Sequence, residues 1–204
     1  MKPYKPVLIV IFILIIDQFT KFWVKTHMFL GEEISITSWF SLHFTENPGM
    51  AFGMVLPGVW GKLFLSGFRL IAVGGGTYFI FYLIKQKAHW GFITAASMIL
   101  AGAIGNMIDG SIYGVIFSDS YMGVARVFPP KGYAGFMQGL VVDMIHVKLF
   151  TFHWDGQVYE FFPFIFNVAD SAITIGVFLI LVFQKMFFKE EVKEETITAA
   201  VEGN

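Results

Sequence analysis

Residues 7–24 read VLIVIFILIIDQFTKFWV, and this stretch decides the class of the fold. It opens with an unbroken apolar run, but Asp17 and Lys21 stand within it. A bilayer core of roughly 30 Å requires about 20 mostly apolar residues in helical form. Lys2 and Lys5 precede the run as they would in a signal peptide, yet no small-residue cleavage site follows it. We therefore interpret this stretch as a retained transmembrane helix.

The composition of the whole chain agrees with a membrane protein. Of its 204 residues, 56% are hydrophobic and only 14% are charged, whereas soluble domains contain about 25% charged residues. A net charge of −1 gives no basic field that would attract nucleic acid. Membrane spans are predicted at about residues 7–24, 62–84, 91–108 and 164–187.

The lysines predict the orientation of these spans. They flank the N-terminus, the loop between the second and third spans, and the C-terminus, and they are Lys2, Lys5, Lys85, Lys87, Lys185, Lys189 and Lys193. Because an even number of spans puts these three segments on one side, the positive-inside rule makes that side cytoplasmic. We predict one integral membrane domain over residues 1–188 and a charged cytoplasmic tail over 189–204.

The two longer connections, at about 25–61 and 109–163, then face outward. Strands are predicted where polar and apolar residues alternate or where β-forming residues are frequent, at residues 34–37, 41–45 and 147–154. Asp155-Gly156, between apolar runs, is a strong hairpin signal. The predicted fold is thus an all-α membrane protein of four transmembrane helices with a small β-rich cap on the outer membrane surface.

Ionisable residues inside membrane spans are expensive and usually functional. In this chain they and their amide neighbours fall near the outer ends of the spans or in an apolar part of the outer segment. These residues are Asp17, Lys21, Asn106, Asp109, Asp143, Asn167 and Asp170. The clustering at one depth predicts a polar site near the outer leaflet.

Several roles are open for these residues. Asp17 and Lys21 share a helix face, which fits a structural ion pair or a pair that positions substrate. Asn106 and Asp109 fit either a site or hydrogen bonding between helices. Two carboxylates in apolar surroundings would share a proton and act as base and acid. The acidic residues in polar loops are interpreted as surface groups, and they are Glu46, Asp119, Asp155 and Glu160.

Other hydrolytic chemistries lack their residues. The chain has no cysteine, and its five histidines show no H-E-x-x-H spacing, so neither a metal nor a cofactor is predicted. His146 and His153 are interpreted as strand residues. An intramembrane aspartyl protease and a proton-coupled transporter remain as alternatives. The near-absence of ionisable groups in the inner halves of the spans favours the protease.

Five motifs in order carry a resemblance to a known family. They are DQFTK at 17–21, ENPGMAFG at 46–53, AGAIGNMID at 101–109, VVD at 141–143 and FNVADSAIT at 166–174. Together they resemble the lipoprotein signal peptidases, the type II signal peptidase family of bacterial membrane aspartyl proteases. The resemblance covers roughly residues 7–185.

The resemblance implies four transmembrane helices with a periplasmic β-cradle, in the bacterial inner membrane. It implies cleavage of a prolipoprotein just before its diacylglyceryl-modified cysteine. The expected partners are that substrate and membrane lipid, and we expect the enzyme to be a monomer. Asp143 and Asp170 correspond to the catalytic aspartates. The positions that match the family's supporting or substrate-contacting residues are Asp17, Lys21, Asn47, Gly49, Asn106, Asp109 and Asn167. Asn47-Pro48-Gly49 is interpreted either as an ordinary turn or as a loop that presents Asn47 to substrate.

Two departures from the family pattern stand out. The third motif usually continues with arginine, whereas Gly110 follows Asp109 here, so a substrate contact is missing unless another residue such as Arg126 supplies it. The outer segments at about 110–141 and 144–163 are also longer than usual. We interpret them as an enlarged cap that alters substrate access.

Overall fold

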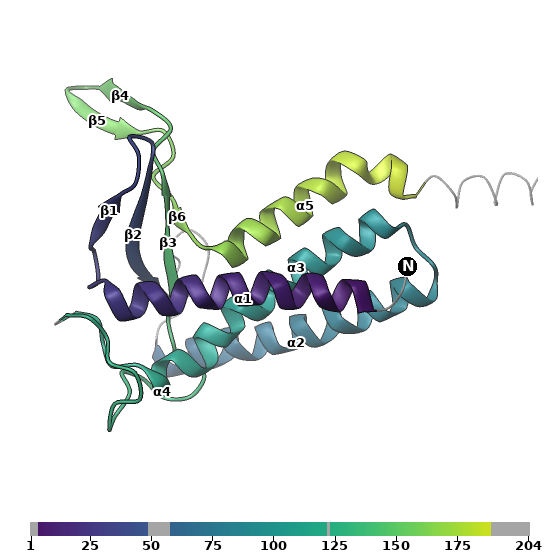
Figure 1. The fold of residues 1–204 in the computed structure, drawn as a ribbon, viewed down its shortest axis with the longest axis horizontal. Helices are drawn as coiled ribbons and strands as arrows, with labels where there is room; N and C mark the ends of the chain where they lie inside the picture. The colour runs from purple at the N-terminus through teal and green to yellow at the C-terminus, as the bar shows by residue number, and fades with distance from the viewer. Residues whose placement is uncertain (1–3, 49–57, 122, 189–204) are drawn as a thin grey trace, which may run out of the picture.

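The computed structural model of the chain describes residues 4–48, 58–121 and 123–188. Within these ranges, four helices are long and apolar enough to cross a membrane. They are α1 (Tyr4–His27), α2 (Gly58–Lys85), α3 (Trp90–Ile108) and α5 (Val168–Phe187). Figure 1 shows them side by side in a bundle, with a small sheet across one end. The predicted set of four spans is confirmed as helices of this length and composition.

Two helix boundaries differ from the sequence prediction for physical reasons. The fourth span was expected from residue 164, but Ile165–Phe166 form strand β6, and α5 starts only at Val168. The third span was expected to end at residue 108. It continues through a π-helical turn, η2 (Asp109–Tyr113), and a short helix, α4 (Gly114–Ile116). A π-turn adds one residue to a helical turn and frequently occurs at functional sites.

The sheet at the end of the bundle has four antiparallel strands in the order β1-β2-β3-β6. Its other strands are β1 (Glu33–Ser35), β2 (Phe40–Asn47) and β3 (Val141–Val147). The register between β2 and β3 shifts between Leu42 and Thr45, where a bulge interrupts the ladder. Strand β3 is more buried than the others, and it carries Asp143. The apolar segment around Asp143 is therefore one of the two inner strands of the sheet, and the sequence analysis had not assigned it as a strand.

The predicted hairpin forms at Asp155-Gly156. It joins β4 (Thr151–Trp154) and β5 (Gln157–Glu160), and both turn residues have positive φ, 49° and 75°. Positive φ at both central positions is the requirement of a type I′ turn. The strand expected over 147–154 is interrupted, because β3 ends at Val147 and β4 starts at Thr151. The hairpin forms a separate two-stranded sheet beyond the main one (Figure 1).

Small residues allow α3 to approach its neighbours closely. A Cβ on Gly102 would lie 2.3 Å from the Ala169 carbonyl oxygen on α5, and a Cβ on Gly105 would lie 2.5 Å from Oδ2 of Asp17 on α1. Close backbone approach through small residues is a common form of helix packing in membranes. The glycines thus bring the polar groups of α1, α3 and α5 together.

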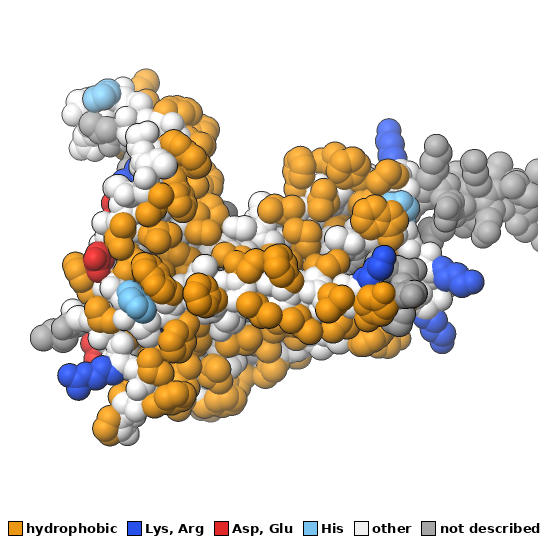
Figure 2. Space-filling model, in the orientation of Figure 1, with side chains coloured by type: hydrophobic (Ala, Val, Ile, Leu, Met, Phe, Trp, Pro, Cys, Tyr) orange, Lys and Arg blue, Asp and Glu red, His pale blue; other side chains and the backbone are white. Residues whose placement is uncertain are grey.

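The outside of the bundle is apolar. Figure 2 shows hydrophobic side chains covering the helices, with most of the visible basic side chains at the end opposite the sheet. Phe19 is 70% exposed and Ile71 is 76% exposed, although both lie within spans. Continuous apolar surface of this kind marks a membrane-facing surface. The chain is therefore built as a multi-pass membrane protein.

Candidate functional site

Lys21 is the centre of a fully buried ionic cluster. Its Nζ lies 3.0 Å from Asp17 Oδ2 and 2.9 Å from Asp109 Oδ2, and all three side chains have no solvent exposure. The same ammonium donates to Asn106 Oδ1 at 2.8 Å. The predicted Asp17–Lys21 pair is therefore part of a three-member cluster in which one cation contacts two carboxylates.

Gln18 extends this cluster, and the sequence analysis did not single it out. Its Nε2 donates to Asp17 Oδ2 and to Asp109 Oδ1, each at 3.0 Å. Its Oε1 accepts from the hydroxyl of Tyr113, at the end of the π-turn, at 3.1 Å. The π-turn thereby places both Asp109 and Tyr113 against the same residue of α1. The position of Gln18 next to Asp17 in the chain was the available signal.

The start of α5 is fixed by this cluster and by its own cap. Asp17 Oδ1 accepts a hydrogen bond from the backbone N–H of Ala169 at 2.9 Å. Asn167 is the N-cap, and its Oδ1 accepts from the N–H of Asp170 at 2.8 Å. The backbone N–H of Asn167 in turn donates to the Asp170 carboxylate, which completes a capping box. These bonds satisfy free N–H groups of the first turn and orient the Asp170 side chain.

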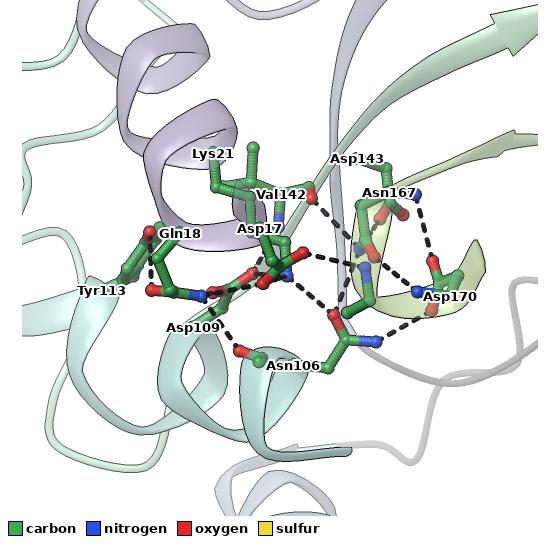
Figure 3. A network of polar contacts seen from close by, with 12 residues as sticks. Asp17, Gln18, Lys21, Asn106, Asp109, Tyr113, Val142, Asp143, Asn167 and Asp170 are labelled. Atoms are coloured by element: carbon green, nitrogen blue, oxygen red, sulfur yellow. Dashed lines mark hydrogen bonds and ion pairs between the residues drawn. The ribbon is translucent and has the colours of Figure 1, made fainter. Parts of the chain in front are cut away.

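Asp143 and Asp170 lie close to one another although they come from a strand and a helix. Asn167 Nδ2 donates to Asp143 Oδ1 at 2.6 Å, and Asn106 Nδ2 donates to Asp170 Oδ1 at 2.8 Å. The two asparagines also contact each other at 3.1 Å. Figure 3 shows the resulting network running from the Lys21 cluster to the two aspartates. The structure thus brings together six of the predicted site residues around Lys21.

The remaining predicted positions are Asn47 and Gly49. Asn47, the last residue of β2, donates from Nδ2 to Asp143 Oδ2 at 3.1 Å. Both oxygens of Asp143 therefore accept hydrogen bonds from amide groups. Gly49 lies outside the described residues.

Asp143 has an unusual proton affinity for an aspartate. Burial, and after it the negative charge of Asp170, raises its pKa to about 7. The hydrogen bonds from Asn47 and Asn167 act in the opposite direction. A carboxyl group with such a pKa holds a proton at near-neutral pH, which a general acid requires.

Two pockets that share Phe164 each include one of the two aspartates in their lining. A more polar pocket of about 500 Å³ is lined by Thr45, Glu46, Asn47, Pro48, Asp143, Pro163, Phe164 and Ile165. A more apolar pocket of about 390 Å³ is lined by Phe162, Phe164, Phe166, Asp170, Ser171, Thr174 and Ile175. Each aspartate is thus accessible from its own pocket.

The interpretation of Glu46 as a surface residue is wrong. Its side chain is 3% exposed and forms an ion pair with Lys25, which is completely buried. Lys25 also donates to Ser120 Oγ at 2.9 Å, and its ammonium lies 4.7 Å from the ring centroid of Tyr133. Lys25 follows Lys21 by one helical turn and so lies on the same, buried face of α1. A buried lysine needs an acidic partner, and this was the available signal for Glu46. Asp119 and Asp155 are exposed, as predicted, and the side chain of Glu160 lies outside the described residues.

One group of potential metal ligands lies in the sheet, and the sequence spacing did not reveal it. Ligand atoms of Glu33, His43 and His146 lie within 4.8 Å of one another. However, Lys148 Nζ lies 2.5 Å from the Glu33 carboxylate. Hydrogen bonding to Lys148 is the largest cause that lowers the pKa of Glu33 to about 2. A carboxylate already neutralised by an ammonium fits an ion pair better than a cation site.

This group is also separated from the two aspartates by the sheet. His146 is three positions from Asp143 on β3. Side chains an odd number of residues apart on a strand point to opposite faces. The assignments of His146 and His153 as strand residues are confirmed.

Comparisons with known proteins give a consistent result. A family model described as signal peptidase (SPase) II matches residues 9–187. A lipoprotein signal peptidase of Porphyromonas gingivalis is 43% identical over 183 residues, covering 85% of this chain and 80% of that protein. One from Amoebophilus asiaticus is 30% identical over 204 residues, covering 93% of this chain and 81% of the other.

A solved structure agrees with these relatives. It is described as a bacterial membrane enzyme determined by the in meso method, and it superimposes with a TM-score of 0.62 and 29% identity. The match covers 89% of this chain and 88% of that chain. The family match spans most of the chain, including all four long helices and the sheet that carries Asp143. The chain belongs to the signal peptidase II family and is a membrane protease that cleaves signal peptides from prolipoproteins.

Proposed function

We propose that Asp143 and Asp170 activate a water molecule that hydrolyses the peptide bond immediately before the diacylglyceryl-modified cysteine of a prolipoprotein. The observation that carries this proposal is the way Asn167 holds both groups. Its amide contacts Asp143 at 2.6 Å, and its backbone N–H contacts the Asp170 carboxylate at 3.3 Å. Two carboxylates held this closely share a proton, which is the arrangement used by aspartic proteases.

The surroundings favour different roles for the two groups. The raised pKa of Asp143, about 7, suits the proton-bearing member. Asp170 lies in the first turn of α5, where the helix N-terminus stabilises negative charge. In the proposed reaction, Asp170 takes a proton from water as the water oxygen bonds to the scissile carbonyl carbon, and Asp143 protonates the carbonyl oxygen.

The second step breaks the bond to the cysteine nitrogen. The tetrahedral intermediate collapses, Asp170 returns its proton to the leaving amine, and Asp143 takes back the proton from the hydroxyl group. Each aspartate ends in its starting state. Positioned proton transfers of this kind contribute about 10²–10⁴-fold each to the rate.

The two pockets suit the two parts of the substrate. The polar pocket beside Asp143 has strand residues of β2 on one side and suits an extended peptide. The apolar pocket beside Asp170 is lined by Phe162, Phe164 and Phe166 and by residues of α5, which faces the membrane. We assign this second pocket to the diacylglyceryl group, so that the modified cysteine lies between the aspartates.

The sheet and the site are assigned to the outer side of the membrane and both termini to the cytoplasm. Lys5, Lys85, Lys87 and Lys185 lie at helix ends or in the loop at the end of the bundle opposite the sheet. The positive-inside rule favours that end as cytoplasmic. Cleavage on the outer side would follow export of the precursor.

The test uses purified protein and a diacylglyceryl-modified precursor, with cleavage followed by gel shift in the presence of EDTA. We expect Asp143→Asn and Asp170→Asn each to abolish cleavage, because asparagine keeps the shape but cannot exchange the proton. The double variant should be no worse than either single variant, since the two groups act as a unit. Asp155→Asn, at an exposed turn, is the matched control. Near-normal cleavage by either folded single variant would overturn the assignment of that residue, and loss of activity in EDTA with rescue by zinc would overturn the mechanism.

A further inference from the structure

Arg69 is a half-buried cation within a membrane span, and the sequence analysis did not single it out. It lies in α2 on the part of the helix classified as a span, Leu63–Lys85. The chain contains only one other arginine, Arg126, which is exposed. An ionisable residue within a membrane span is energetically costly and usually functional. Such a residue is retained for a reason, and its neighbours indicate which.

The guanidinium lies against Gly110, the first residue after Asp109. A Cβ added at Gly110 would be 2.7 Å from Nη1 of Arg69. Any other residue at this position would therefore displace the guanidinium. The contact is with the end of a flexible side chain, which could move aside. A substitution at Gly110 would therefore shift the Arg69 guanidinium and have less effect on the stability of the fold.

The charge of Arg69 interacts electrostatically with Asp109 and Asp170. These two carboxylates differ in what else they contact. Asp109 is completely buried and already accepts bonds from Lys21, Gln18 and the N–H of Val142. Asp170, in contrast, lines the apolar pocket. The guanidinium beside Gly110 therefore acts electrostatically on one carboxylate of the buried cluster and on one that lines a pocket.

A peptide that enters this site brings carbonyl oxygens that need hydrogen-bond donors. An unsatisfied peptide carbonyl in an apolar environment is destabilising. The amides of Asn47, Asn106 and Asn167 already donate to the two aspartates. A guanidinium has five N–H donors in a planar fork and stays charged at all relevant pH values, so it suits one or two carbonyl oxygens.

We propose that Arg69 binds backbone carbonyl oxygens of the precursor beside Asp170, and that Gly110 is the residue that makes room for it. The proposal rests on the proposed function of the site. It also explains the departure at position 110, where the family resemblance led us to expect arginine. The positive charge comes from α2 instead of from the residue after Asp109, and Arg126 is not needed for it.

Binding is measured separately from cleavage to test the proposal. In the Asp143→Asn background, the affinity of a fluorescent diacylglyceryl precursor is followed by anisotropy in detergent. We expect Arg69→Ala to weaken binding about 10- to 100-fold, the range for a hydrogen bond to a charged group. Arg69→Lys should recover part of the loss, and Arg126→Ala should bind normally. Thermal unfolding of each variant identifies losses caused by misfolding.

Gly110 provides a second and independent measurement. Gly110→Ala should weaken binding when Arg69 is present but have no further effect when combined with Arg69→Ala. The combination of Arg69→Ala with Gly110→Arg should restore part of the binding, because the guanidinium returns to the same space. The proposal is overturned if Arg69→Ala binds normally, or if Gly110→Ala has the same effect in both backgrounds. A different result would overturn the proposed function itself, namely cleavage that persists in the Asp170→Asn variant.

Discussion

Lys21 gives the most direct test of how the buried cluster is held together. Lys21→Met keeps a long side chain but removes the ammonium that lies 3.0 Å from Asp17 and 2.9 Å from Asp109. Both carboxylates would remain buried without the ammonium group that now contacts them. Removing one partner of a buried pair costs about 3–5 kcal/mol. Because one lysine serves two carboxylates here, we expect a loss at the upper end of that range.

Asp17→Asn is the informative comparison. The sequence alone suggested that this change would leave Lys21 unpaired, but the structure shows that Asp109 remains as its partner. Asparagine can still accept from the N–H of Ala169 through Oδ1, but its Nδ2 then faces the Lys21 ammonium and the Gln18 amide, which are donors as well. The change then removes one charged hydrogen-bond partner, a loss of about 1.5–3 kcal/mol. We therefore expect Asp17→Asn to be less destabilising than Lys21→Met.

The measurement is thermal unfolding of the purified protein in detergent, followed by intrinsic fluorescence. Lys85→Met, at the exposed end of α2, controls for loss of a lysine as such. Activity should fall with stability in both cluster variants. Equal destabilisation by Asp17→Asn and Lys21→Met, or unfolding of Lys21→Met at the unaltered temperature, would refute the idea of a shared cation.

Two further predictions concern pH and orientation. Because burial raises the pKa of Asp143 to about 7, its proton is lost as the pH rises through that value, and we expect cleavage to decline there. Asn47→Ala removes a hydrogen bond that lowers this pKa, so the decline should move to higher pH, and a shift to lower pH would contradict the proton assignment. The chain has no cysteine, so single cysteines can be labelled without other changes. An impermeant thiol reagent added to spheroplasts should label Asp119→Cys and not Gln86→Cys, and the reverse pattern would invert the proposed topology.

The spans were predictable because their signal is local. An apolar run of about 20 residues has few alternatives to a membrane helix, and all four runs form one. The hairpin at Asp155-Gly156 was predictable for the same reason, since its turn depends on two adjacent residues. In contrast, the start of α5 depends on β6, which forms only where β3 is present to pair with it. Hydropathy does not contain that information.

The site was predictable in part from motifs, and the remainder depends on tertiary contacts. Asp143 and Asp170 stand out as carboxylates in apolar segments. Glu46 did not, because its burial is caused by Lys25, which is distant in the chain. Arg69 escaped notice because its role depends on the space left by Gly110 on another helix. The available signal for Arg69 was a charged residue within a predicted span, and for Lys25 it was a lysine one helical turn after Lys21, just beyond the predicted end of the first span.

The hydrogen-bond directions in the cluster connect Lys21 to the two aspartates. An ammonium group can only donate, so the Asn106 oxygen must face Lys21, and the Asn106 amide nitrogen then faces Asp170. This fixes Asp170 Oδ1 as a hydrogen-bond acceptor.

The same reasoning applies to Asn167. The backbone N–H of Asp170 can only donate, so the Asn167 oxygen faces it and its amide nitrogen faces Asp143. The residues that contact the proposed catalytic pair, Asp143 and Asp170, therefore determine which of its oxygen atoms accept hydrogen bonds. The buried ionic cluster thus joins α1, α3 and α5 and also orients the two aspartates. A change at Lys21 should therefore alter catalysis even in the fraction of protein that remains folded.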